Sequence, residues 1–154
     1  MSEHLASIEW RREGQTFSDN QYARAHDWRF DGGAVVRGSS APTSVPTPMS
    51  DPAAVDPEEA LVAAVSSCHM LFFLSFAAKR GFVIDSYTDR ASGIMEKNAE
   101  GKIAMTRITL RPHIVFGGER RPTQEEIDRM HHDSHEQCFI ANSLKSEIVL
   151  EPVT

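Results

Sequence analysis

The two cysteines, Cys68 and Cys138, are the residues of this chain best suited to redox or metal chemistry. A permanent structural disulfide is uncommon in a reducing compartment, so we expect the pair to be inert or chemically active. Taken alone, Cys68 would be a small core hydrophobe within an apolar helix. The middle of a helix does little to lower the pKa of a thiol, whose ordinary value is about 8.5. A reactive Cys68 therefore needs a cationic neighbour from elsewhere in the fold.

A metal site is one alternative interpretation of the later cysteine. His131, His135 and Cys138 are spaced i, i+4 and i+7, which places them on one helix face. His69 or His132 could complete a tetrahedral ligand set. The charged segment HHDSHEQ instead favours a solvent-facing helix whose histidines lie at the surface. Metal analysis of protein purified without a histidine tag would separate these interpretations.

A long helix is expected to position Cys68. The predicted helix runs from Pro57 to Arg80, with Asp56 as its N-cap and Glu59 at the capping-box position. Its body, ALVAAVSSCHMLFFLSFAAK, is apolar on nearly every face. This pattern predicts a helix that is buried on most sides at the centre of the fold.

Short antiparallel strands are expected before this helix. Residues 7–36 contain apolar and aromatic runs separated by polar residues, with a turn at Gly32-Gly33. The proline-rich residues 39–57 then predict an extended surface loop, because proline fits neither a helix interior nor a central strand.

Strands and a second helix are expected after it. Residues 82–96 and 103–116 predict two strands joined by a polar turn, with Pro112 at an edge or a bulge. TQEE is a capping box that opens a helix over residues 123–137, and residues 146–152 predict a last strand. The fold class is therefore α+β, with antiparallel sheets around a long buried central helix.

Length and charge restrict the classes of function. The 154 residues suit one domain with its own core, and the net charge of -6 argues against sequence-independent binding of nucleic acid or anionic lipid. The start of the chain, MSEHLASIEWRREG, lacks the features of a secretory signal, so a cytoplasmic location is expected. The longest apolar stretch, Met70 to Ala78, is shorter than the roughly 20 residues that a membrane span requires.

Three segments occur in the order DPEEALVAAVSSCHMLFFL, TRITLRP and HEQCFIANSLKSEI. Together they resemble the OsmC/Ohr family of organic hydroperoxide reductases, and the similarity runs from about Tyr22 to the C-terminus. The most specific part is a PEE-helix-SC block followed by a CFIANS block. The resemblance implies a single OsmC-like domain over residues 1–154, which forms an intertwined homodimer.

The resemblance also implies the roles of individual residues. In this family the first cysteine is peroxidatic and the second resolves it, which assigns these roles to Cys68 and Cys138. Glu58 matches the catalytic glutamate of the family. The catalytic arginine lies in the N-terminal strand region, and its candidates in order of preference are Arg24, Arg29 and Arg37.

The implied reaction is thiol-dependent reduction of an organic hydroperoxide, without a metal or cofactor. Cys68 would be oxidised to a sulfenic acid, Cys138 would form a disulfide with it, and an external dithiol such as a lipoylated protein would reduce the disulfide. An apolar surround would suit alkyl or fatty-acid hydroperoxides. Its expected members are Met70, Phe72, Phe73 and Phe139. The alternative within the family is a ligand-binding or redox-sensing protein without turnover.

Helix geometry argues for a shared site. Glu58 and Cys68 are ten positions apart on the predicted helix, or about 15 Å along its axis. Glu58 therefore cannot reach Cys68 of its own chain if the helix is unbroken. A second chain with its helix packed antiparallel could supply Glu58 and Arg24 to this site.

Overall fold

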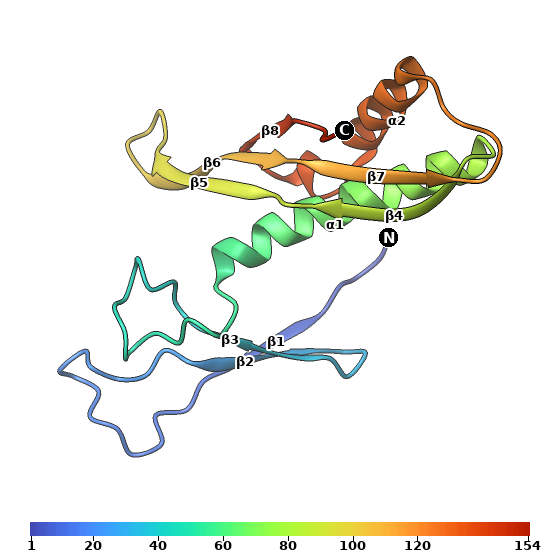
Figure 1. Ribbon diagram of the computed structural model, residues 1–154. Coiled ribbons are helices and arrows are strands. Elements are labelled where there is room, and N and C mark those ends of the chain that lie inside the picture. Colours follow the sequence, from blue (N-terminus) through green and yellow to red (C-terminus); the bar gives the residue numbers. More distant parts are fainter. The chain divides into compact units, whose positions relative to one another are not determined.

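Helix α1, Pro57–Lys79, is the longest element of the computed structural model, which describes residues 1–154 (Figure 1). The Glu59 amide donates to Asp56 Oδ1 at 2.8 Å, and the Asp56 amide donates to Glu59 Oε2 at 3.3 Å. The helix ends before Gly81, whose φ of 79° lies in the left-handed region that glycine adopts without strain. The predicted capping box is confirmed, and the predicted helix ends one residue late.

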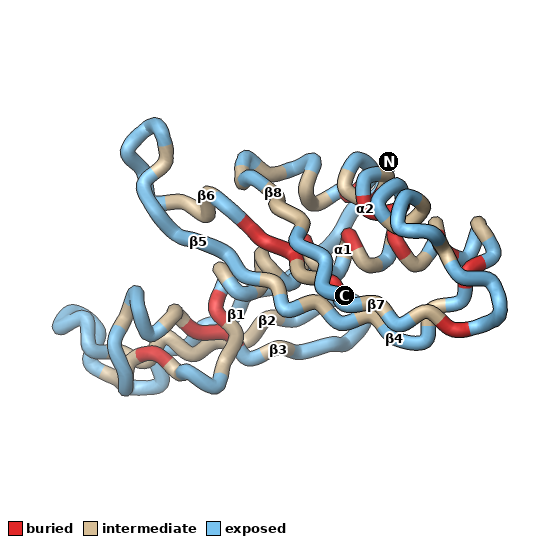
Figure 2. The backbone as a smooth tube through the Cα atoms, turned by 45° about the horizontal axis from the view of Figure 1, so that its top comes forward, coloured by how far each residue is buried: buried red, intermediate tan, exposed pale blue.

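Burial along α1 is confined to one stripe. Val65, His69, Phe73 and Ala77 recur every fourth residue and are buried, whereas Leu71 on another face is 61% exposed. Figure 2 shows buried residues only as short red stretches of a tube that is otherwise tan and pale blue. The prediction of a helix buried on most sides is therefore wrong for the single chain. The sequence is apolar on every face, but only one face is buried.

The apolar character of α1 extends over its whole length. By length and composition alone α1 could cross a membrane, because its most apolar window has a mean hydropathy of 1.9. The core helix of a soluble protein meets the same criterion. The longest apolar stretch, from Met70 to Ala78, is much shorter than the helix, so the absence of a membrane span stays a prediction.

The chain forms two compact units, Met1–Ala60 and Leu61–Thr154. The buried apolar side chains all belong to the second unit. Neither unit by itself decides whether the whole chain behaves as one domain. The single OsmC-like domain over residues 1–154 stays a prediction.

Three antiparallel strands form the sheet of the first unit, in the order β1–β2–β3. They are β1, Ala6–Glu9; β2, His26–Phe30; and β3, Val35–Gly38. Gly33, with a φ of 95°, lies in the turn between β2 and β3, as the Gly32-Gly33 pair predicts. The proline-rich loop contains no helix or extended strand, and its Val55 forms an isolated bridge to Gly38.

Both tryptophans of the chain lie in the first unit. Trp10 packs near Phe17 and Tyr22, with ring centroids 5.8 and 5.4 Å away, and Trp28 belongs to β2. The second unit contains no tryptophan.

Four strands replace the two strands predicted after α1. They are β4, Val83–Asp89; β5, Ser92–Lys97; β6, Ile103–Leu110; and β7, Pro112–Gly117. β4 pairs with β7 and β5 with β6, both antiparallel. The first predicted strand is interrupted after Asp89 and the second after Leu110. The two interruptions are in contact, because the Arg111 amide donates to Asp89 Oδ1 at 2.6 Å. The next residue, Pro112, lacks an amide hydrogen. The prediction of two continuous strands is therefore wrong, whereas the turn between β5 and β6 is confirmed.

The remaining elements follow the prediction closely. Helix α2, Gln124–Gln137, begins with a capping box in which the Glu126 amide donates to Thr123 Oγ1 at 3.2 Å. A short 3-10 helix spans Ala141–Ser143, and β8, Glu147–Leu150, pairs with β6 in parallel. Among the paired strands this parallel pair is the exception, and the fold is α+β with mainly antiparallel sheets and a central helix.

The core of the second unit consists of two apolar clusters along the buried stripe of α1. The first cluster contains Phe73, Ala77, Phe82 and Met130, and the second contains Val65, Ile108 and Leu110. His69 occupies the position on the stripe between Val65 and Phe73. A polar side chain therefore separates the two clusters, next to Cys68 in the sequence.

Candidate functional site

The structure brings Cys68 and Cys138 together within the second unit. Cys68 lies near the middle of α1 and is half-buried, whereas Cys138 is the C-cap residue of α2 and is 1% exposed. Both thiols are free, and they lie near enough to each other for Cys68 to raise the pKa of Cys138. Because a disulfide requires two thiols that can approach each other, this arrangement suits reversible disulfide formation.

The surroundings of Cys138 keep its thiol protonated. Burial raises the pKa of Cys138 to about 11, and the neighbouring Cys68 contributes to the increase. The Ala141 amide, which donates to Cys138 Sγ at 3.4 Å, acts in the opposite direction. Since the thiolate is the nucleophile, Cys138 is poorly suited to make the first attack on a peroxide.

The turn that carries Cys138 is fixed by side chains of the CFIANS block. The Asn142 amide donates to the Cys138 carbonyl at 3.0 Å, and Asn142 Nδ2 donates to the Glu136 carbonyl at 3.0 Å. Ser143 Oγ donates to the Phe139 carbonyl at 2.7 Å. The resemblance of this block to the family motif did not predict roles for Asn142 and Ser143. Their side chains hold the backbone of the turn in place.

Arg24 lies in the first unit, just before β2. Its guanidinium stacks on the Tyr22 ring at 3.6 Å from the centroid, and its Nη2 donates to Asn20 Oδ1 at 2.9 Å. No carboxylate pairs with Arg24, since it takes part in none of the ion pairs of the structure. Its guanidinium is therefore not neutralised within the chain.

The two alternative arginines are engaged in ion pairs on the exposed sheet of the same unit. Arg29 contacts Glu9 at 2.9 Å and Asp27 at 3.3 Å, and Arg37 contacts Asp27 at 3.1 Å. This difference favours Arg24 among the three candidates. The role of Arg24 beside Cys68 stays a prediction.

Glu58 lies in the first turn of α1 and is half-buried. Its Oε2 atom is buried without a hydrogen-bond donor. Burial of a carboxylate oxygen without a partner is unfavourable, so this atom is suited to accept from a cation. Glu59 instead serves the capping box, as predicted.

The histidines differ from the prediction of a solvent-facing row. His131 is only 4% exposed, and its Nδ1 lies 3.0 Å from Nε2 of His69, which is 1% exposed. Burial lowers the pKa of His69 to about 3 and that of His131 to about 4, so both rings are neutral at pH 7. The surface interpretation is correct for His132 and wrong for His131.

The metal alternative is not supported by the arrangement of its proposed ligands. No three histidine, cysteine, aspartate or glutamate side chains converge in a geometry that could hold a metal ion. Of the proposed set, His69 and His131 are hydrogen-bonded to each other, and Cys138 interacts with Cys68.

A groove of about 380 Å³ lies between α1 and α2. Its lining combines two aromatic side chains with polar and charged ones: Phe72, Phe76, Ser75, Gln137, Lys79, Asp133 and Glu136. Phe139 packs edge-on against Phe72 with centroids 5.0 Å apart, but it is 69% exposed, and Phe73 faces the core. The prediction that Phe139 belongs to a buried apolar lining around Cys68 is therefore wrong. Phe73 is part of the core and has a structural role.

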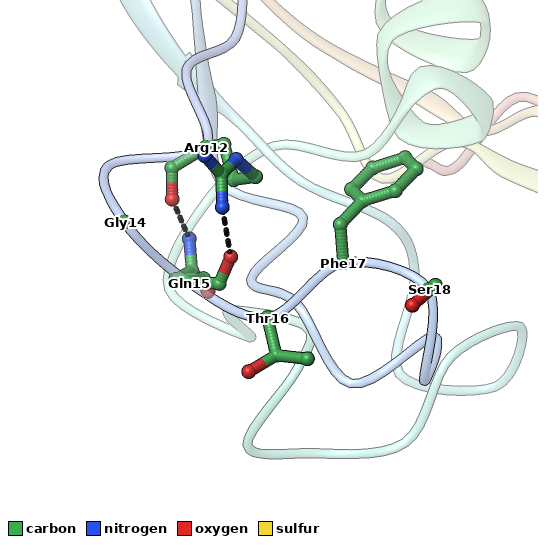
Figure 3. A pocket seen from close by; sticks show the side chains of 6 residues that line it. All are labelled: Arg12, Gly14, Gln15, Thr16, Phe17 and Ser18. Carbon is green, nitrogen blue, oxygen red and sulfur yellow. Dashed lines mark hydrogen bonds between the residues drawn. The ribbon is translucent and has the colours of Figure 1, made fainter.

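A second cavity, of about 530 Å³, lies at the loop of residues 12–18 in the first unit (Figure 3). Its walls are held together by Arg12 and Gln15, which exchange two hydrogen bonds of 2.9 Å. The lining residues include no cysteine, histidine or carboxylate. This cavity therefore lacks the groups that redox or acid-base chemistry requires.

Comparisons with known proteins agree with this fold. The family model described as OsmC-like protein matches residues 50–153. A solved OsmC-like protein of unknown function from Vibrio cholerae is 53% identical, with a TM-score of 0.98 over 99% of this chain and 100% of that chain. A comparison with curated proteins found no match.

Two more distant solved structures show the same fold. An organic hydroperoxide resistance protein from Elizabethkingia anophelis is 14% identical, with a TM-score of 0.70 over 99% of this chain and 94% of that chain. The organic hydroperoxide resistance protein OhrB of Bacillus subtilis is 16% identical, with a TM-score of 0.62 over 97% and 98% of the two chains. From the family match and the Vibrio cholerae relative, we conclude that this chain belongs to the OsmC-like family.

Proposed function

We propose that this protein is a thiol-dependent peroxidase that reduces organic hydroperoxides through Cys68 and Cys138. The observation that carries the proposal is the contact between a half-buried Cys68 and a fully buried Cys138 with a raised pKa. This asymmetry suits Cys68 to the first attack and Cys138 to the second. The similarity of fold to two organic hydroperoxide resistance proteins supports the choice of substrate.

The proposed reaction has three steps. The Cys68 thiolate attacks the hydroperoxide, so that an S–O bond forms and the O–O bond breaks. The departing alkoxide takes up the proton that the Cys68 thiol released and leaves as an alcohol. The Cys138 thiol then displaces the hydroxyl of the Cys68 sulfenic acid as water and closes a disulfide. An external dithiol, such as a lipoylated protein, reduces the disulfide by thiol exchange and is itself oxidised. No metal or cofactor takes part.

Arg24 and Glu58 complete the proposed site. A guanidinium without a carboxylate partner and a buried carboxylate oxygen without a donor are chemically complementary. We propose that Glu58 holds Arg24 through a bidentate pair and that Arg24 favours the Cys68 thiolate. This assignment rests on the resemblance to the family, on the lack of a carboxylate partner for Arg24 and on the lack of a donor for Glu58 Oε2.

A homodimer is proposed as the active form. Because α1 is continuous from Pro57 to Lys79, Glu58 stays about 15 Å along the axis from Cys68 of its own chain. Exposed apolar side chains lie on α1 and on the sheet of the first unit: Leu71, Ile8, Phe30 and Val35. A second copy that covers these faces would also deliver Glu58 and Arg24 to Cys68.

The groove and the composition of the chain indicate which substrates, partners and cellular location we propose. The groove beside Phe72 offers an apolar surface for the organic part of an alkyl or fatty-acid hydroperoxide. With a net charge of -6, the protein is not expected to bind nucleic acid or a membrane, and a cytoplasmic location would supply reduced dithiols.

The test is a comparison of two cysteine variants in a hydroperoxide assay with dihydrolipoamide. Cys68→Ser should abolish turnover, because a serine hydroxyl is a far weaker nucleophile than a thiolate. Cys138→Ser should allow one fast oxidation of Cys68 and then stall as a sulfenic acid, detectable by mass spectrometry after trapping. Turnover by Cys68→Ser would refute the proposal. A wild-type protein without turnover would favour the ligand-binding or redox-sensing alternative.

A further inference from the structure

A single side-chain hydrogen bond connects the two helices that carry the cysteines. His69 on α1 and His131 on α2 meet at 3.0 Å between Nε2 and Nδ1, and their rings are stacked at 15° with centroids 5.3 Å apart. Beyond the end of α1, Arg80 pairs with Asp133 of α2 at 2.8 Å, but that pair is partly exposed. The histidine pair is therefore the one buried polar link between α1 and α2.

The pair is placed where it can control the distance between the thiols. His69 directly follows Cys68 in α1, and His131 lies seven positions, or about two turns, before Cys138 at the end of α2. On α1, His69 also separates the two apolar clusters of the core. Apolar packing is non-directional, so packing alone allows one helix to shift along the other. A hydrogen bond has a preferred distance and angle, and a bond at this point therefore fixes the position of α2 relative to α1.

The protonation state and burial of the two rings favour a stable hydrogen bond between them. The bond needs one neutral ring as donor and the other as acceptor, and burial keeps both rings neutral. His131 Nε2 is buried without any partner, so His69 supplies the only hydrogen bond of the His131 ring. The ionisable groups that influence the two rings are His135, Asp128 and Asp89.

We propose that the His69–His131 hydrogen bond positions α2 against α1 so that Cys138 is held beside Cys68, which favours disulfide formation. Both histidines are positioning residues, because they act through the cysteines. The inference rests on the proposed function only in requiring that Cys68 and Cys138 form a disulfide.

The experiment measures the dithiol–disulfide equilibrium without peroxide. Protein is equilibrated with mixtures of reduced and oxidised dithiothreitol, quenched by alkylation and analysed by mass spectrometry. Oxidation removes two electrons and two protons from the cysteine pair, and oxidised dithiothreitol accepts them as its own disulfide is reduced. Loss of the link in His69→Leu should shift the equilibrium about tenfold towards the dithiol, which corresponds to about 30 mV.

Two further variants separate positioning from folding. His69→Gln offers an amide near the position of Nε2 and should restore the equilibrium at least in part. His69→Leu/His131→Leu leaves no buried polar partner unpaired, so it should fold and still show the shift. Tyr87→Phe is the matched control, since it removes a buried hydroxyl without a partner from the same core and should leave the equilibrium unchanged.

The outcomes distinguish this inference from the proposed function. A folded double-leucine variant with the wild-type equilibrium constant would overturn the positioning role while leaving the peroxidase proposal intact. If His69→Gln shifts the equilibrium as far as His69→Leu, the hydrogen bond is not the cause and the proposal also fails. A wild-type protein that forms no Cys68–Cys138 disulfide with oxidised dithiothreitol would overturn both.

Discussion

Cys68 occupies the middle of α1, where neither end of the helix dipole can stabilise a thiolate. The proposed reactivity of Cys68 therefore requires a neighbouring cation. Arg24 is the candidate, since Arg29 and Arg37 already neutralise Asp27 and Glu9 on an exposed sheet. An arginine without a carboxylate partner can devote its charge to another group.

Arg24→Ala should raise the pH at which Cys68 is alkylated. An adjacent positive charge favours the thiolate, so its loss is expected to move the midpoint upward by about one pH unit or more. The measurement is the rate of iodoacetamide labelling of Cys68 in the Cys138→Ser background, followed from pH 5 to pH 9. Arg29→Ala is the matched control and should leave the midpoint in place. An unchanged profile for Arg24→Ala would transfer the role to Arg29 or Arg37.

At the residue scale, the sequence identified the proposed cysteine pair but not the surroundings of this pair. The order of the two motif blocks selected Cys68 and Cys138, and the fold brings them together. The burial of His131 was not predicted, because the charged neighbours in HHDSHEQ indicated a segment that is exposed as a whole. A signal was present, since Ile127, His131 and Ser134 are spaced as an inward-facing helix stripe.

At the scale of elements, the contact between α1 and α2 makes stability depend on pH. His69 and His131 titrate near pH 6.5 when unfolded, but burial lowers their folded pKa values to about 3 and about 4. At a pH between the folded and the unfolded pKa values, the unfolded chain binds more protons than the folded chain does. The stabilisation from keeping these rings neutral is therefore complete above pH 6.5 and is lost progressively as the pH falls towards 4.

Urea denaturation between pH 7 and pH 4.5 would measure this dependence. Each histidine is expected to contribute a slope of up to about 1.4 kcal/mol per pH unit to the free energy of unfolding. His69→Leu/His131→Leu cannot titrate at these positions, so its profile should be flatter than that of the wild type. Equal slopes would mean that other groups cause the acid sensitivity. Protein concentration is kept constant, because association would alter the apparent stability.

The elements themselves were predictable where local chemistry decides them. Capping residues fixed the starts of α1 and α2, and Gly33 fixed a turn. The breaks between β4 and β5 and between β6 and β7 were not predicted, because alternation of apolar residues continues across them. They depend on the Asp89 carboxylate contacting the Arg111 amide, a contact between residues distant in sequence. Likewise, an all-apolar helix does not reveal which of its faces its own chain covers.

At the scale of the whole molecule, a shared site predicts complementation between inactive variants. Cys68→Ser and Glu58→Ala should each be inactive, but a mixed dimer would contain Cys68 of one chain and Glu58 of the other at one intact site. Random exchange should restore about a quarter of wild-type activity, since half the dimers would carry one site. The measurement is peroxide turnover after subunit exchange that is verified by native mass spectrometry.

The control for complementation uses a chain that carries both changes. A mixture of Cys68→Ser with Cys68→Ser/Glu58→Ala contains no reactive cysteine and should stay inactive at every ratio. Verified exchange between the single variants without recovery would place Glu58 and Cys68 of one site in the same chain. Full activity in a demonstrated monomer would equally refute the shared site.

The uneven distribution of aromatic residues gives the molecule an internal spectroscopic label. Trp10 and Trp28 both belong to Met1–Ala60, so tryptophan emission reports on this unit alone. Circular dichroism at 222 nm is dominated instead by α1 and α2, most of whose residues belong to Leu61–Thr154. The wild-type sequence thus carries a separate optical reporter for each unit. Coincidence of the two signals during unfolding is the criterion for one cooperative domain, and no label has to be introduced to apply it.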